Sequence, residues 1–447
     1  MEIYTLNLLL LLTLSLALFF STQHNRNPPI TTTTTKNNKK NLTPFLLAYT
    51  LAMASDWLQG PFLYPLYQHT HHLPASLIPS LFTTGFVSSA LSSGLVGRWA
   101  DRYGRKRACL AFCGVYALSC VLTTGVVGGG GGGDSETLLM GGLVLGRVLG
   151  GVGTGLLFVG FESWVVGFLS THSGEEEEGG LGRVLGVMSG LNSVVAVVCG
   201  VGSEAVVRAA GTRKAPFWVA TGVLGLAGGV IWWFWDENYG ETAAGAKNEK
   251  GDKTRSSVWV VLSNPQVLAL GAASTVFEGS MYLFVFFWSP ALKSVQSSEG
   301  ELPYGVIFAS FMAATLASSL AFNMITERQL MRHTSLLVAI LGVSAACFFL
   351  SATPGTEQSV FWVFCLFEAA VGMYWPCMGY LKGRLVDDGV RAQVYGILRI
   401  PLNVFVVVSL LFTGDGNGHG KVFSVCAGLL LASSGAVWAV MEGQASS

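Results

Sequence analysis

Apolar stretches of about 20 residues recur along most of this 447-residue sequence, and each is long enough to cross a bilayer as an α-helix. Only 12% of the residues are charged, and the mean hydropathy is +0.53. Soluble domains carry about 25% charged residues, so this chain cannot cover a water-facing surface of ordinary size. A soluble enzyme, a nucleic-acid-binding protein and a disordered chain are thereby excluded. The sequence predicts an all-α polytopic membrane protein.

The distribution of apolar and polar residues predicts five segments. Residues 1–24 form an N-terminal hydrophobic anchor, which lacks the basic start and the small-x-small cleavage site of a secretory signal. A polar linker at 25–42 leads to a bundle of six helices at 43–235. A linker rich in Lys, Glu, Asp and Gly at 236–262 separates it from a second bundle of six helices at 263–441. The twelve helices are expected at about 43–67, 77–97, 108–128, 138–168, 184–207, 216–235, 263–291, 304–325, 335–353, 359–381, 392–412 and 421–441.

Basic residues in the loops predict the orientation of these helices. If the loop at 97–107 is cytosolic, the loops on its side carry fifteen Lys and Arg residues, among them Lys382, and those on the opposite side carry five. Loops rich in Lys and Arg stay in the cytosol. The linkers at 25–42 and 236–262 are therefore expected to be cytosolic, and the anchor should place its own N-terminus outside.

The two bundles resemble each other in sequence. Three short matches follow the same order in both halves, at offsets of 222, 206 and 210 residues, which indicates a duplicated six-helix unit. Repeated bundles with a substrate site at the membrane midplane are typical of secondary transporters. The matching residues are Asp56 with Glu278, Glu162 with Glu368, and Gly186 with Gly396.

The loop from Gly97 to Arg107 resembles the signature loop of the major facilitator superfamily, G-x-x-x-D-R-x-G-R-K. Its position between the second and third helices agrees with that family. The resemblance implies a fold of two six-helix bundles that works by alternating access. Asp101 is suited to cap a helix N-terminus and to pair with Arg105, forming a charged latch between moving helices. The latch residues are Gly97, Asp101, Arg102, Gly104, Arg105 and Lys106.

A narrower resemblance covers residues 50 to 440. The segment from Ser55 to Tyr64 is similar to the first-helix signature of the eukaryotic molybdate-anion transporters. Further similar segments follow in the same order on the expected helices, and the resemblance implies uptake of molybdate, a tetrahedral dianion. These segments are Gly146 to Gly151, Phe161 to Trp164, Glu237 to Tyr239, Phe284 to Pro290 and Arg399 to Leu402.

Two arginines inside predicted helices are the first candidates for contact with an anion. A guanidinium group stays charged and offers a planar fork of donors to an oxyanion. Arg399 is the first choice, because the corresponding residue of the other half is the uncharged Ser189. Arg147 is the second, and Asp56, Trp57, Tyr282 and Tyr374 are the other candidates for the substrate site. The alternative is that each arginine pairs permanently with an acidic residue and holds its bundle together.

Three intramembrane carboxylates, Glu162, Glu278 and Glu368, are candidates for proton coupling or for ion pairs. A dianion entering against a negative-inside potential needs a driving force of about 2.3 kcal/mol per charge per 100 mV. Proton symport is one source of that driving force, so protons are a candidate coupling ion.

The sequence thus predicts a secondary transporter that takes up molybdate into the cytosol, in the plasma membrane, with the lipid bilayer around it. Transport of sulfate or an organic anion is the alternative within this class, and a non-transporting membrane sensor of the same fold is the alternative outside it. We expect no cofactor, no metal site and no enzymatic activity, because the sequence contains no nucleophile–base pair, phosphate-binding loop or metal-ligand cluster.

Overall fold

The computed structural model describes residues 2–25, 36–125, 133–172, 178–239, 261, 263–297, 300–386, 388–411 and 418–441. Within these residues the backbone forms helices and short turns and contains no strand. The chain divides into two compact units. Unit 1 contains residues 1–27, 246–303 and 310–447, and unit 2 contains residues 28–245 and 304–309. Residues 26–35 and 240–260 of the two expected linkers lie outside the described residues.

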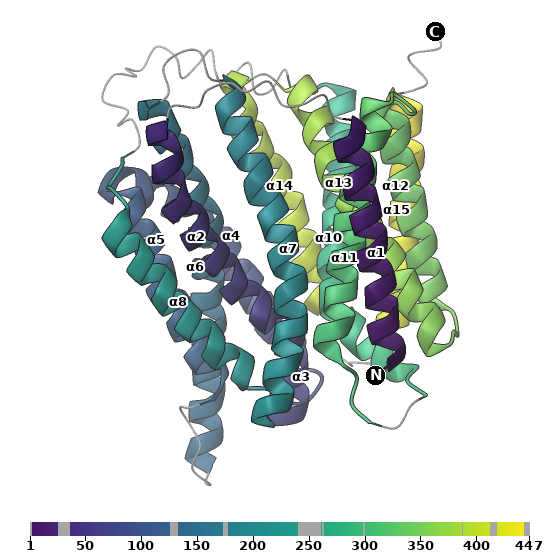
Figure 1. Cartoon of the computed structure of the whole chain (residues 1–447). Helices are drawn as coiled ribbons and strands as arrows, with labels where there is room; N and C mark the ends of the chain where they lie inside the picture. The colour runs from purple at the N-terminus through teal and green to yellow at the C-terminus, as the bar shows by residue number, and fades with distance from the viewer. Residues whose placement is uncertain are drawn as a thin grey trace. The chain divides into compact units, whose positions relative to one another are not determined.

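Unit 2 contains the six helices expected for the first bundle (Figure 1). The helix expected at 43–67 is not continuous, because Pro61 lacks a backbone donor and follows Gly60. After α2 the chain passes through the 3₁₀ turn η1, the short α3 and the π-helical turn η2. The elements are α2 (Lys36–Gln59), η1 (Gly60–Phe62), α3 (Leu63–Pro65), η2 (Leu66–Thr70), α4 (Ile78–Tyr103), α5 (Arg105–Thr123), α6 (Gly133–His172), α7 (Glu178–Ala210) and α8 (Ala215–Phe234).

Unit 1 combines the N-terminal helix with the helices expected for the second bundle. The first residues of α11, 304–309, are grouped with unit 2 and the rest of that helix with unit 1. The helices are α1 (Glu2–Asn25), α10 (Pro265–Ser294), α11 (Tyr304–Glu327), α12 (His333–Ala352), α13 (Glu357–Leu385), α14 (Asp388–Leu411) and α15 (His419–Met441).

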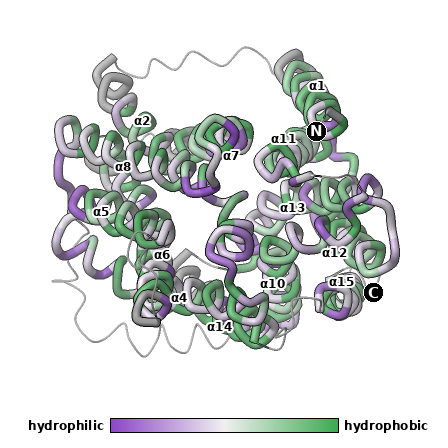
Figure 2. Tube along the Cα trace, turned by 90° about the horizontal axis from the view of Figure 1, so that it is seen from below, coloured by the Kyte–Doolittle hydropathy of each residue, from purple (hydrophilic) through white to green (hydrophobic). Residues whose placement is uncertain are grey.

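Ten helices of the described residues are long and apolar enough to cross a membrane: α1, α5 to α8, α10 to α13 and α15. Helices α2, α4 and α14 are less apolar for local reasons. Helix α2 begins with a polar stretch at 36–42, α4 ends in the charged signature loop, and the apolar part of α14 is limited to Ile397–Leu411. Figure 2 shows most of the helical tube in hydrophobic or neutral colours, with hydrophilic residues in short stretches.

Glycines of α6 bring this helix close to α4 and α5. A Cβ atom at Gly151 would collide with the backbone oxygen of Gly85 on α4. Likewise, a Cβ atom at Gly150 would lie 3.0 Å from Oγ of Ser119 on α5. Small residues permit such close approach of membrane helices, and hydroxyl groups join them, because Oγ of Ser119 donates to the backbone oxygen of Gly146 at 2.7 Å.

Helix α1 packs on α11 and α13 within unit 1, through a face that contains polar residues (Figure 1). Oγ of Ser15 donates to the backbone oxygen of Ala313 at 3.2 Å, and Nδ2 of Asn7 donates to Oε1 of Gln358 at 3.0 Å. The opposite face is apolar and exposed, with Leu6 and Phe20 as examples. The buried face of α1 thus combines polar residues such as Asn7 and Ser15 with apolar ones such as Leu8 and Leu11, as expected for a helix that packs on protein within a membrane.

Candidate functional site

The signature loop contains the expected ion pair between Asp101 and Arg105. Nε and Nη2 of Arg105 donate to Oδ1 of Asp101 at 3.0 and 2.9 Å. Asp101 lies in the last turn of α4, and its side chain is 52% exposed. Two other residues of the loop take no part in this ion pair. The guanidinium of Arg102 lies over the Tyr103 ring at 5.5 Å, and Gly97 packs near Val159 of α6.

The cap of α5 comes from Glu237, whereas the sequence suggested Asp101. Oε1 of Glu237 accepts a hydrogen bond from the backbone nitrogen of Lys106 at 2.7 Å. Gly104 has a φ of +114°, and a Cβ atom there would collide with the Glu237 carboxyl group. Glycine at this position therefore provides both the backbone conformation and the space for the cap.

The same segment closes the end of α8. Nζ of Lys106 donates to the backbone oxygens of Trp235 and Trp232 at 2.6 and 3.1 Å. A lysine at a helix C-terminus satisfies carbonyl groups that have no partner within the helix. The latch residues thus connect α4, α5 and the segment after α8 inside unit 2.

Trp164 holds this same segment from α6. Its Nε1 donates to the backbone oxygen of Asp236 at 3.0 Å, and Nδ2 of Asn238 donates to the backbone oxygen of Trp164 at 2.9 Å. The rings of Trp164 and Trp235 pack with centroids 4.2 Å apart. Two sequence segments that resemble the family, 161–164 and 237–239, therefore meet in space for a structural reason.

Arg147 has partners inside unit 2. Its Nε donates to the backbone oxygen of Leu81 at 3.4 Å, and its guanidinium lies over the Phe82 ring at 5.3 Å. It also interacts electrostatically with Asp56, which accepts a short hydrogen bond from the Tyr116 hydroxyl. Arg147 and Asp56 therefore belong to one polar cluster of unit 2, although the described residues show no ion pair between their charged atoms.

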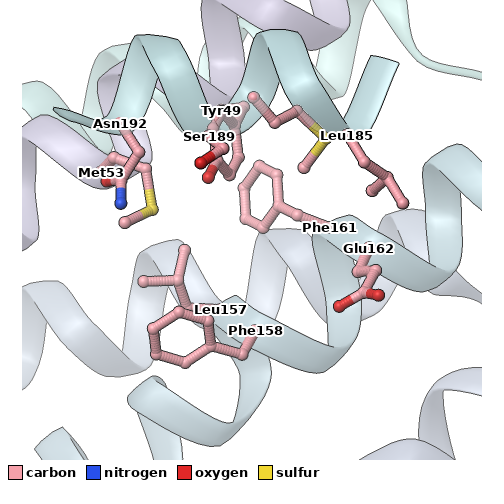
Figure 3. A pocket seen from close by; sticks show the side chains of 10 residues that line it. Tyr49, Met53, Leu157, Phe158, Phe161, Glu162, Leu185, Ser189 and Asn192 are labelled. Carbon is pink, nitrogen blue, oxygen red and sulfur yellow. The ribbon is translucent and has the colours of Figure 1, made fainter. Parts of the chain in front are cut away.

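A cavity of about 260 Å³ lies between α2, α6 and α7 of unit 2 (Figure 3). Figure 3 shows Asn192 and Met53 at one end of this cavity and Glu162 at the other. Nε1 of Trp57 donates to Oδ1 of Asn192 at 2.7 Å, so Trp57 orients a lining residue. The cavity is lined by Tyr49, Met53, Leu157, Phe158, Phe161, Glu162, Leu185, Met188, Ser189 and Asn192.

Glu162 is the charged side chain of this lining. It is exposed, and the described residues contain no hydrogen bond or ion pair to its carboxyl group. None of the described residues that line the cavity is cationic. An ionised Glu162 repels an anion, so this cavity can exchange a proton or hold a neutral group but is unsuited to hold an oxyanion.

A polar cluster in unit 1 surrounds Glu278, which is buried on α10. Oε1 of Glu278 accepts hydrogen bonds from Oγ of Ser274 at 2.6 Å and from the hydroxyl group of Tyr374 at 2.9 Å. Nζ of Lys382 lies 3.7 Å from the same oxygen and donates to Oγ of Ser274 at 2.8 Å. Lys382 is a residue that sequence reasoning missed and assigned to a cytosolic loop, although a lysine in the last turn of an apolar helix was the available signal.

Arg399 lies on α14 near this cluster. It interacts electrostatically with Lys382 and with Tyr282, another expected site residue. Its side chain is exposed, and within the described residues no protein group hydrogen-bonds to it or forms an ion pair with it. Lys382, Glu278 and Tyr374 thus contact one another or a shared serine in unit 1, and Arg399 and Tyr282 are linked to them electrostatically.

Glu368 lies apart from these cations in its own buried position. Its Oε2 accepts a hydrogen bond from Oγ1 of Thr315 at 3.1 Å, which links α13 to α11. The same hydroxyl group is 3.1 Å from the backbone oxygen of Glu368. Among the described residues Glu368 has no ion-pair partner.

Comparison with known proteins identifies the family. A family model described as sugar transporters with 12 transmembrane helices matches residues 10–366. The molybdate-anion transporter of Xenopus tropicalis is 32% identical over 397 residues, which cover 86% of this chain and 82% of the relative. That of Danio rerio is 32% identical over 426 residues, which cover 87% and 84%. The chain belongs to the molybdate-anion transporter family of the major facilitator superfamily.

Solved structures agree on the fold. A POT family transporter in complex with 5-aminolevulinic acid has a TM-score of 0.70 at 10% identity, covering 88% of this chain and 94% of that one. A mutant of the nucleoside transporter NupG has a TM-score of 0.67 at 11% identity, covering 90% and 99%. This member of the molybdate-anion transporter family is therefore a multi-pass membrane transporter with the major facilitator fold, and it is not an enzyme.

Proposed function

We propose that this transporter takes up molybdate into the cytosol by alternating access, in the plasma membrane. The relatives named molybdate-anion transporters support an inorganic oxyanion as the substrate class. The observation that carries the proposal is the exposed guanidinium of Arg399, which has no hydrogen-bond or ion-pair partner among the described residues. A charge placed inside a membrane helix without such a partner is suited to a ligand that comes and goes.

The two cations of this cluster, Arg399 and Lys382, favour an anion over a sugar as the substrate. The family model is nevertheless described as one of sugar transporters. Two cations can donate hydrogen bonds to a neutral polyol, but an oxyanion gains in addition the attraction between opposite charges. Tyr282 and Tyr374 belong to the same cluster, in which the hydroxyl group of Tyr374 donates to Glu278.

Coupling to protons supplies the driving force in this proposal. Glu162, Glu278 and Glu368 are the candidates, and they differ in their surroundings. Glu162 faces an open cavity, Glu278 has a lysine nearby, and Glu368 accepts from a threonine hydroxyl group. Glu162 is thereby suited to exchange protons with water and Glu278 to link a proton to an anion.

The test is molybdate uptake by cells that lack their own molybdate uptake system. Expression of this chain should raise cellular molybdenum, and excess tungstate should compete more strongly than excess sulfate, because tungstate is closer in size and geometry to molybdate. A sugar should not compete. Uptake that sulfate or an organic anion suppresses and tungstate does not would assign the protein another substrate.

Counterflow in proteoliposomes separates a transporter from a sensor of the same fold. Vesicles loaded with unlabelled molybdate should accumulate labelled molybdate transiently if the protein exchanges substrate across the bilayer. Specific binding without counterflow would favour the sensor.

A further inference from the structure

The ion pair of unit 1 is bridged through a hydroxyl group. The 3.7 Å between Nζ of Lys382 and Oε1 of Glu278 exceeds a hydrogen-bond distance. Oγ of Ser274 completes the connection, accepting from Lys382 at 2.8 Å and donating to Glu278 at 2.6 Å. Lysine has three donors, so this arrangement leaves Lys382 donors for another acceptor.

Burial makes the charges of this cluster costly unless they balance. The side chain of Lys382 is 18% exposed and that of Glu278 is 8% exposed. With Glu278 ionised, the cluster of Glu278, Lys382 and Arg399 carries one net positive charge. With Glu278 protonated, it carries two, which matches a dianion such as molybdate.

The geometry of Lys382 allows it to serve the anion site. It lies three residues before the end of α13 at Leu385, and helical side chains point back toward the N-terminus of their helix. Its ammonium group therefore reaches into the bundle, where its Nζ lies 5.8 Å from the Tyr395 ring on α14, the helix that carries Arg399. Lys382 and Arg399 also interact with each other electrostatically.

The ionisable groups around the cluster come from four helices. Lys382 and Arg399 are the two cations, and Glu278 is the carboxylate. The remaining groups are Tyr282 on α10, Tyr374 and Cys377 on α13, Tyr395 on α14 and, near Ser280, Cys426 on α15. Since tyrosines and thiols are neutral near pH 7, the charge of this cluster comes from Lys382, Arg399 and Glu278.

We propose that Lys382 is the second cation of the anion site, and that Glu278 holds it until a proton neutralises the carboxylate and releases the ammonium group to the dianion. This inference rests on the proposed function and adds a binding residue and a coupling step. No covalent bond changes except that one proton moves onto Glu278, and the anion replaces the carboxylate as the charge partner of Lys382. Binding of the proton thus strengthens binding of the anion, and the reverse.

Binding of molybdate to purified protein tests the inference with two variants. Glu278→Gln mimics the protonated carboxylate, so this variant should bind molybdate with an affinity that no longer falls as the pH rises. Adding Lys382→Gln to Glu278→Gln should weaken binding by about tenfold or more, a difference of ~1.4 kcal/mol. If Lys382 were only a counterion for Glu278, the double variant would bind as well as the single one, and that result would overturn the inference.

Proton uptake supplies a second measurement. Addition of molybdate to wild-type protein in weak buffer should be accompanied by proton uptake, and Glu278→Gln should abolish that uptake while binding persists. Equal proton uptake by both proteins would contradict the role of Glu278. Lys293→Gln, a change at an exposed lysine on the same helix α10, should leave binding and proton uptake unchanged.

Separate control experiments check that each variant folds and that the proposed function holds. Gel filtration and thermal unfolding should show folded protein for each variant. If Glu278→Gln does not fold, molybdate binding by Lys382→Arg can be compared with molybdate binding by Lys382→Gln. The arginine variant keeps the positive charge and should bind molybdate at least roughly tenfold more tightly. Failure of wild-type protein to bind or transport molybdate would refute the proposed function, whereas equal binding by the paired variants refutes the inference alone.

Discussion

The hydroxyl group of Tyr4 donates a hydrogen bond of 2.6 Å to Oε1 of Glu357, 353 residues further along the chain. Both side chains are buried. The other carboxylate oxygen of Glu357 accepts from the backbone nitrogen of Ser297 at 3.1 Å. The start of α1 is therefore fixed to the start of α13 and to the segment after α10. All three lie on the side that the loop charges predict to be outside, which agrees with an external N-terminus.

Retention of α1 in the mature protein is the first prediction. A cleaved secretory segment would leave the buried Glu357 without one of its donors. Tyr4→Phe should lower the free energy of unfolding by about 1.5–3 kcal/mol, since a hydrogen bond to a charged group is lost. Thermal unfolding in detergent measures this change, and Leu6→Ala, at an exposed position of the same helix, should have little effect. Absence of residues 2–25 from peptides of the purified protein would contradict the prediction.

The second prediction concerns the cap of α5. Glu237→Ala removes the acceptor for the backbone nitrogen of Lys106 and should lower stability by about 0.5–2 kcal/mol, the usual cost of a lost helix cap. Hydrogen exchange in the first turn of α5 should rise in this variant. Asp236→Ala is the matched control, because the neighbouring Asp236 side chain is exposed and its backbone oxygen, which accepts from Trp164, is kept. Equal effects of the two changes on stability and hydrogen exchange would show that Glu237 does not cap α5.

Hydropathy predicted the helices well, because a span is fixed by its length and apolar content rather than by its partners. Expected and observed helices differ by a few residues at most ends. The larger error lies at Gly60 and Pro61, where a local break interrupts an otherwise apolar stretch. The docking of α1 on α11 and α13 could not be predicted, since it depends on contacts between residues such as Tyr4 and Glu357 that are far apart in sequence.

The candidate site was harder to predict from sequence for a different reason. In the sequence, a basic residue near the end of an apolar helix cannot be distinguished from a basic residue of a cytosolic loop. The sequence therefore assigns Lys382 to a loop. Its direction into the bundle is a property of the folded helix. Arg147 shows the opposite case: it stood out as an intramembrane charge, yet the contacts with Leu81 and Phe82 that engage it could not be foreseen.

The third prediction separates rate from binding at the signature loop. The Asp101 side chain is 52% exposed and that of Arg105 is 14% exposed. Because i,i+4 ion pairs on helices contribute only about 0.3–0.5 kcal/mol, Asp101→Asn and Arg105→Ala should still fold. Both variants should slow transport and leave molybdate affinity nearly unchanged, because the latch acts on the equilibrium between inward-open and outward-open states. Transport rates in proteoliposomes, compared with binding in detergent, distinguish these effects. Normal cycling, or a loss of binding instead of rate, would give the loop a different role.

The fourth prediction tests contact between Arg399 and the substrate. Arg399→Lys keeps the charge but loses the planar fork of donors, so uptake should fall partly. Arg399→Gln loses both and should nearly abolish uptake. Because the described residues give Arg399 no hydrogen bond or ion pair, neither variant leaves a protein group without a partner there, and both should reach the membrane in normal amounts.

Surface expression and molybdate uptake in the same cells measure both effects, with Arg332→Gln as a control at an exposed arginine before α12. Near-normal uptake by both Arg399 variants would refute the contact. Loss of expression in both would favour a structural ion pair instead. Rescue by Glu278→Gln would then identify its partner, since that change removes the nearby carboxylate and restores the charge balance of α10, α13 and α14.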